Sequence, residues 1–251
     1  MVLWLVFYFV LGSTLGSFLN LCACRLPQGR SIVWGRSACD SCGHKLAVYD
    51  LVPVISYAAL KGRCRYCNTA YGCSNLAAEV LTGLTFVLCG WQSAPGLRLL
   101  LLLCLTCCLI LVSLIDYRLQ IIPDGLVALI AFSGIFYSAL YLPEGIAGGL
   151  SGSVLAFSIT LAIFILSRGG MGGGDVKLSA ALGLWLGLEQ TAMFLLLAFI
   201  SGGLIATLLL IGGVKGRQEA IPFGPFLCAG AFAALLFARQ LADFYWSVFY
   251  F

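Results

Sequence analysis

Long apolar stretches run through most of this chain and restrict the folds open to it. We count about eight, most of them near the roughly 20 residues that a helix needs to cross a bilayer core. They lie at about 2–21, 73–92, 97–115, 122–141, 145–166, 176–189, 190–212 and 221–240. Only 10% of the residues are charged and 61% are hydrophobic, which leaves too few charges for a soluble surface. The sequence therefore predicts an all-α polytopic membrane protein with about eight transmembrane helices.

Two of these stretches need comment. The sixth, 176–189, is too short to cross alone at about 1.5 Å per residue, so we expect it to recruit glycines before it or residues of the next helix. The first lacks the basic start of a signal peptide and runs directly into GSFLNLCACRLP, so we keep it as a mature helix. The predicted organisation is a first transmembrane helix at 1–24, a polar loop at 25–72 and a helical bundle at 73–251.

The basic residues predict the orientation. The polar loop carries Arg25, Arg30, Arg36, Lys45, Lys61, Arg63 and Arg65. If this loop is cytoplasmic, alternating spans also place Arg118, Arg168, Lys177, Lys215 and Arg217 inside. Of the 14 Lys and Arg, that leaves Arg98 and Arg239 outside. The positive-inside rule thus predicts that both termini lie outside, and the basic excess requires no nucleic-acid partner.

Four of the 12 cysteines form two Cys-x-x-Cys pairs in the polar loop: Cys39, Cys42, Cys64 and Cys67. Two such pairs hold one Zn²⁺ between four thiolates, although the interval 43–63 slightly exceeds the usual range of about 15–20 residues. Gly43 and Asn68 follow the pairs and suit tight turns. Because cytoplasmic thiols stay reduced, a structural zinc is favoured over disulfides, and four unpaired thiols are the alternative.

Three aspartates lie at the ends of predicted spans. Asp116 ends the third span, Asp124 follows Pro123 at the start of the fourth, and Asp175 begins the sixth. Asp116 and Asp175 are thus predicted at one membrane depth on separate helices, where an ionisable group indicates function. Two such carboxylates can share a proton and activate a water for attack on a peptide carbonyl.

A plainer interpretation of these residues is also open. Asp116 then pairs with Arg118, and Asp175 caps its helix while Lys177 extends toward the interface. For Asp124 the plainer interpretation is stronger still, because a residue after Pro123 is typical of a turn or of a helix start. The only histidine, His44, is typical of a solvated loop residue, and a single histidine excludes HExxH zinc proteases and disfavours a Ser-His-Asp triad.

The glycine run before Asp175, GGMGGGDVKL at 169–178, raises the question of a phosphate loop. It contains no GxGxxG register and no following GK[ST], so that class is excluded. We expect flexible backbone beside the aspartate, which lets an extended substrate approach closely.

Several stretches together resemble type IV prepilin peptidases, the leader peptidase/N-methyltransferases of pilus and type II secretion systems. They are GSFLNLCACRLP (16–27), the paired CxxC loop, DYRLQIIPD (116–124), GGGDVK (172–177) and IPFGPFL (221–227). The GxGD stretch alone also occurs in presenilin-like proteases. The combination covers nearly the whole chain.

The resemblance implies an enzyme of the bacterial inner membrane. It would cleave the basic leader of prepilins or pseudopilins after a glycine on the cytoplasmic face, with Asp116 and Asp175 as the catalytic pair. It would then methylate the new N-terminal residue, usually Phe, with S-adenosyl-L-methionine. The candidate residues for methyl transfer are Gly16, Asn20, Arg25 and Glu79. The candidates for substrate binding are Gly172, Gly174, Lys177 and Arg118.

This chain departs from the family sequence pattern at one place, and three alternative functions stand beside this hypothesis. Family members usually carry Tyr-Pro where this chain has Tyr71 and Gly72, which puts the turn near Glu79 in doubt, and methyl transfer more than cleavage. The rivals are a peptidase of the same fold without significant methyltransferase activity, a GxGD protease for other membrane substrates, and a transporter with membrane carboxylates. A transporter predicts midplane carboxylates and inverted repeats, and we see neither.

Overall fold

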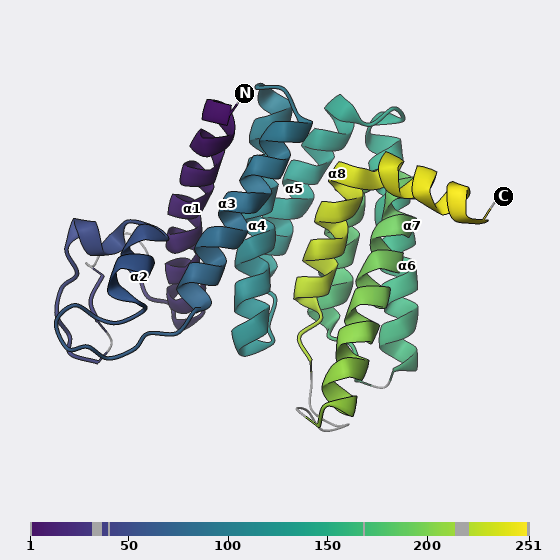
Figure 1. The fold of residues 1–251 in the computed structure, drawn as a ribbon. Coiled ribbons are helices and arrows are strands. Elements are labelled where there is room, and N and C mark those ends of the chain that lie inside the picture. Colours follow the sequence, from purple (N-terminus) through teal and green to yellow (C-terminus); the bar gives the residue numbers. More distant parts are fainter. Residues whose placement is uncertain (1, 32–36, 40, 168, 214–220, 250–251) are drawn as a thin grey trace. The chain divides into compact units, whose positions relative to one another are not determined.

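The computed structural model describes residues 2–31, 37–39, 41–167, 169–213 and 221–249, and at 239 and 241–249 it describes the backbone alone. Within these ranges the chain is helical, with no named strand (Figure 1). It divides into two compact units, Met1–Leu111 and Val112–Phe251, and the boundary falls inside α4 (Leu97–Leu119). Four residues used for the orientation, Arg36, Arg168, Lys215 and Arg217, lie outside the described ranges, as does the side chain of Arg239.

The first unit is built on the packing of α1 (Val2–Arg25) along α3 (Ser74–Gln92), visible in Figure 1. Gly12 and Gly16 make this contact possible. A Cβ atom on either would lie 2.6 Å from a carbonyl oxygen of α3, so the two backbones touch directly. Small residues four apart are a common means of close helix packing in membranes.

The described part of the polar loop between α1 and α3 contains two 3-10 turns, η1 (Leu26–Gln28) and η2 (Val48–Leu51), and one short helix, α2 (Ile55–Leu60). The buried Asp50 organises it by accepting a hydrogen bond from Arg65 Nε at 2.7 Å. Burial alone opposes ionisation of Asp50, but the hydrogen bonds from Arg65 and from the backbone N–H of Ala47 outweigh it and lower the pKa of this carboxyl.

The second unit contains α5 (Asp124–Tyr141), α6 (Gly145–Leu166), α7 (Gly173–Ile211) and α8 (Gly224–Phe249). Trp185 joins α7 to α5: its Nε1–H donates to the carbonyl of Ile130 at 2.9 Å, and its ring stacks on Tyr137. Gly152 of α6 and Gly183 of α7 bring their backbones so close that a Cβ on either would lie 2.5 Å from the other's carbonyl oxygen.

The 39 residues of α7 do not form one rod, which would be about 58 Å long and roughly twice a bilayer core. Gly187 interrupts the helix with a φ of 70° and a ψ of −176°, a conformation that favours glycine. The first part starts with Gly174 against Ile122, just before α5, and ends with Gly187 against Leu142, just past the far end of α5.

The second part of α7 returns toward the starting end. Gly202 packs on Phe223, which immediately precedes α8, and the first N–H of α8 reaches Asp116 near the end of α4. The chain therefore reverses at Gly187, as expected for two adjacent predicted spans.

Among the described residues, six helices are long and apolar enough to cross a membrane, and Gly224–Ala238 is a shorter apolar helix. With α7 divided at Gly187, these account for the predicted stretches. The predicted class, an all-α polytopic membrane protein, is confirmed.

Candidate active sites

The two predicted aspartates both belong to the second unit and are both buried. Asp116 lies in the last turns of α4. The helix ends at Leu119, and Pro123 then caps α5. Asp175 is in the first turn of α7. The two carboxyl groups are close enough to interact electrostatically. The fold therefore brings together two buried carboxyl groups from separate helices at one end of the unit.

Each of these aspartates is held by one backbone N–H. The Oδ2 atom of Asp116 accepts from Gly224 at 2.8 Å, and that of Asp175 accepts from Gly172 at 3.1 Å. In the reverse direction, the N–H of Asp175 donates to the carbonyl of Gly172 at 3.1 Å. The plainer interpretation made Asp175 the N-cap, whereas the N-cap of α7 is Gly172 and Asp175 is the third residue of the helix. The bond from the Gly172 N–H fixes the orientation of the Asp175 carboxyl group.

The glycine run is less flexible than expected at its end. We expected loop backbone up to Asp175, but α7 already begins at Gly173, so Gly173 and Gly174 are helical. Gly172 is the N-cap, and a Cβ on Gly174 would lie 3.1 Å from Ile122. The two hydrogen bonds between Gly172 and Asp175 stabilise this early start, because they pair backbone N–H groups that have no partner within the helix.

The two basic candidates for substrate binding lie near this end of the unit. Arg118 is partly buried in the last turn of α4. Lys177 donates to Asp124 at 2.9 Å, and both side chains of this pair are exposed. Asp124 is the first residue of α5, the helix-start position predicted for it.

The four loop cysteines form one cluster, whose Sγ atoms all lie within 4.8 Å of one another. The Sγ atoms of Cys39 and Cys67 are 3.8 Å apart. A tetrahedral Zn²⁺ with bonds of about 2.3 Å sets its sulfur ligands about 3.8 Å apart, so the cluster fits zinc. The exposed His44 is not part of it and stacks on Tyr66.

The two Cys-x-x-Cys pairs are each closed by the same backbone hydrogen bond. In the first, Gly43 N–H donates to the carbonyl of Cys39 at 2.8 Å; in the second, Asn68 N–H donates to that of Cys64 at 2.9 Å. Gly43 and Asn68 both have positive φ, 69° and 57°. Both adopt the tight turns predicted for them.

The thiols of the cluster perturb one another's ionisation. Hydrogen bonds with the side chain and backbone of Thr69 lower the pKa of Cys67 to about 6. At Cys42 the backbone of His44 acts in the same direction, but burial and the neighbouring thiols outweigh it and raise the pKa to about 11. Four thiols this close ionise together only with a positive charge between them.

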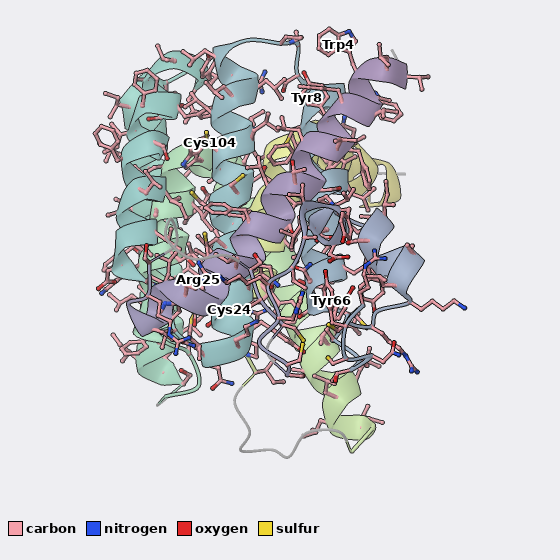
Figure 2. The ribbon with its side chains drawn as sticks, turned by 90° about the vertical axis from the view of Figure 1, so that its left-hand side faces the viewer. Trp4, Tyr8, Cys24, Arg25, Tyr66 and Cys104 are labelled. Atoms are coloured by element: carbon pink, nitrogen blue, oxygen red, sulfur yellow. The ribbon has the colours of Figure 1, made fainter. Side chains whose placement is uncertain are left out.

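A cavity of about 500 Å³ lies in the first unit, between the cysteine loop and the ends of α1 and α3. Its size suits a small-molecule ligand. Asn20, Arg25 and Glu79, three of the four candidates for methyl transfer, line it. Figure 2 shows Cys24 and Arg25 together at this end of α1, with Trp4 and Tyr8 at the other. Gly16 does not line the cavity; it packs against Ala78 and Thr82 of α3.

Glu79 is the centre of a hydrogen-bond chain at the cavity wall. Its Oε1 accepts from Asn75, whose Oδ1 accepts in turn from Asn20 at 3.0 Å, and its Oε2 accepts from the backbone N–H of Val54 at 2.7 Å. The buried carboxylate thus joins α1, α3 and the loop.

Sequence reasoning missed several residues of these sites. Asp50, Tyr57, Tyr71 and Asn75 also line the cavity, and Gly224 contacts Asp116. Asn75 could have been found from its position four residues before Glu79, on the same helix face. The contact of Gly224 joins residues 108 apart and leaves no local pattern.

Helices of spanning length define a polytopic membrane protein, and two of these helices carry buried carboxyl groups. Residues 10–93 match the family described as Bacterial Peptidase A24 N-terminal domain, and residues 103–207 match the Type IV leader peptidase family.

Relatives with the name Prepilin leader peptidase/N-methyltransferase match nearly the whole chain. The protein of Burkholderia pseudomallei is 33% identical over 264 residues, covering 93% of this chain and 85% of the relative. That of Bacillus subtilis is 30% identical over 239 residues, covering 94% and 96%. That of Klebsiella pneumoniae is 36% identical over 207 residues, covering 78% and 91%. No solved structure matches the chain.

The chain therefore belongs to the type IV leader peptidase family. It is a multi-pass protein of the inner membrane.

Proposed function

We propose that this protein cleaves the leader peptide of type IV prepilins or type II secretion pseudopilins and then methylates the new N-terminus. Membership of the leader peptidase family supports the reaction, as does the name shared by its relatives. The observation that carries the assignment to residues is the buried pair Asp116 and Asp175, held toward one end of the second unit by separate helices.

The two carboxyl groups divide the work of peptide hydrolysis. The ionised member takes a proton from water, whose oxygen bonds to the carbonyl carbon. The protonated member donates a hydrogen bond to the carbonyl oxygen. When the C–N bond breaks, a proton passes to the leaving amine.

The substrate reaches this site from the cytoplasmic face, where the loop 25–72 also lies, and both termini are outside. The positive charges of that loop support this orientation. Gly172 and Gly174 line the approach with backbone and no side chain. Lys177 and Arg118 offer positive charge to an acidic residue of the substrate just beyond the cleaved bond.

Methyl transfer belongs to the first unit in this proposal. When bound, S-adenosyl-L-methionine supplies a methyl group on a cationic sulfur. The cavity wall offers Glu79 and Asp50 to its positive charges and Arg25 to its carboxylate, while Asn20 supplies an amide. Gly16 acts indirectly, because it sets the spacing of α1 and α3 beneath the cavity.

A structural zinc completes this unit. Cys39, Cys42, Cys64 and Cys67 use all four positions of a tetrahedral ion, so this metal folds the loop and takes no part in the chemistry. Cys39 and Cys64 also line the cavity, which makes the metal site part of its wall.

One experiment tests both activities. The purified protein is incubated with a prepilin and isotopically labelled S-adenosyl-L-methionine, and the product is weighed by mass spectrometry. We expect a shortened chain that carries one labelled methyl group. A shortened chain without the label makes the protein a peptidase of the same fold without significant methyltransferase activity, and an intact prepilin overturns the proposal.

A further inference from the structure

The first residue of α8 contacts one of the two buried aspartates. The N–H of Gly224 donates to Asp116 Oδ2 at 2.8 Å, and both groups are buried. A helix leaves its first N–H groups without intrahelical partners, so each must find another acceptor. At the start of α8, the acceptor of this N–H is an aspartate 108 residues earlier in the chain.

The sequence around Gly224 leaves one donor for Asp116. Pro225 has no N–H, and the N–H groups of Phe226 and Leu227 both donate to the carbonyl of Phe223, at 3.0 and 3.1 Å. Of the first four residues of α8, Gly224 alone is left to donate outside the helix.

Gly224 is also confined by the absence of space beside it. A Cβ atom at this position would lie 2.7 Å from Oδ2 of Asp116 and 3.0 Å from its Cγ. The φ of Gly224 is not among the positive values, so the residue is not required by backbone conformation. Glycine is required here because the backbone approaches the carboxylate.

The segment before Gly224 is held in place by aromatic packing. The ring of Phe223 stacks on Phe199 of α7 with centroids 5.2 Å apart, and Gly202 leaves room for that ring. The peptide between Phe223 and Gly224 is therefore fixed by the second part of α7, and its N–H stays directed at Asp116.

We propose that Gly224 is a positioning residue for peptide hydrolysis, which holds Oδ2 of Asp116 by its N–H so that Oδ1 is directed at the attacking water. This inference rests on the proposed role of Asp116. It gives the start of α8 a role in cleavage and none in methyl transfer.

The test compares Gly224→Ala with wild type in the full-length protein, reconstituted in liposomes and assayed with a synthetic prepilin. Alanine is a better helix former than glycine, so the helix itself is not weakened. We expect kcat for cleavage to fall about 10- to 100-fold because the carboxylate is displaced, with KM within about twofold of wild type. Methyl transfer to an already cleaved pilin, measured on the same sample, should stay unchanged and reports intact protein.

Two further variants keep the result interpretable. Gly203→Ala is the matched control, because a Cβ there meets nothing within 4 Å. Phe223→Leu loosens the segment without adding atoms beside Asp116, so it decides the matter if Gly224→Ala does not fold; we expect a smaller fall in kcat.

The possible failures are distinct. If wild type cleaves and Asp116→Asn does not, but Gly224→Ala keeps the wild-type kcat, the positioning role is overturned. A change in KM alone overturns it too. If wild type does not cleave, or Asp116→Asn cleaves normally, the proposed function itself fails.

Discussion

Glu79 accepts a hydrogen bond from the backbone N–H of Val54 at 2.7 Å and so ties the cysteine loop to α3. Val54 has a φ of 62°, a strained conformation for a β-branched residue. Such strain costs about 1–3 kcal/mol and persists only where neighbouring groups enforce it. Glu79 therefore holds the loop in the conformation that shapes the cavity of the first unit.

Replacing Glu79 by Gln tests whether Glu79 holds the loop in this way. The carboxylate accepts from both Val54 and Asn75, whereas an amide has one acceptor oxygen and sets its NH₂ against one of these donors. We expect the affinity for S-adenosyl-L-methionine, measured by calorimetry, to fall about tenfold, and methyl transfer with it. Cleavage should not change. Glu189 is exposed, so Glu189→Gln is the control. Unchanged affinity in Glu79→Gln would contradict this role of Glu79.

The cysteine cluster predicts the metal content. Wild type should contain about one equivalent of zinc, and Cys64→Ser should lose most of it because the buried thiolate is a ligand. The exposed Cys73, outside the cluster, provides the matched Cys73→Ser control. Metal analysis of the purified proteins decides. Full zinc content in Cys64→Ser would contradict the assignment.

Substitutions of Lys177 and of Asp124 should have opposite effects on KM for cleavage. Both side chains are exposed, so breaking the pair should change stability by less than about 1 kcal/mol. If Lys177 binds an acidic residue of the prepilin, Lys177→Gln should raise KM for cleavage. Asp124→Asn releases the ammonium and should lower it.

A second prepilin, with its acidic residue changed to Gln, serves as the control for these two variants. With it, neither variant should change KM. Equal effects on both substrates would remove Lys177 from the substrate site.

The contact between Gly152 and Gly183 predicts a stability effect in the second unit. Gly183→Ala places a methyl group 2.5 Å from the carbonyl oxygen of Gly152, and backbone cannot move aside as a side chain can. We expect a loss of about 1–3 kcal/mol, seen as a lower unfolding midpoint in detergent. Gly203→Ala has open space and should behave as wild type. Equal midpoints for all three proteins would show that the helices can separate.

Features that depend on neighbouring residues could be predicted from the sequence. The spans come from local composition, and the turns at Gly43 and Asn68 come from local spacing, so both were within reach. The short span 176–189 was correctly expected to recruit preceding glycines, because its length was insufficient. Its exact start at Gly173 depends on the hydrogen bonds between Gly172 and Asp175, which the length of the span does not reveal.

Contacts between distant segments could not be predicted in the same way. The bond from Gly224 to Asp116 depends on the return of α7 at Gly187, which brings α8 back to the end of α4. The bond from Val54 to Glu79 depends on a strained loop residue of a type that rarely adopts positive φ. Neither has a periodic or compositional signal.

The central claim is that Asp116 and Asp175 form the catalytic pair for cleavage, and substitution of each tests it most directly. Asparagine keeps the size of the side chain and can still accept the backbone hydrogen bonds from Gly224 and Gly172. Cleavage of a prepilin by Asp116→Asn and Asp175→Asn is followed by mass spectrometry, with methyl transfer to an already cleaved pilin as the measure of intact protein. The account predicts no detectable cleavage and normal methyl transfer in both variants; cleavage at the wild-type rate by either one would contradict it.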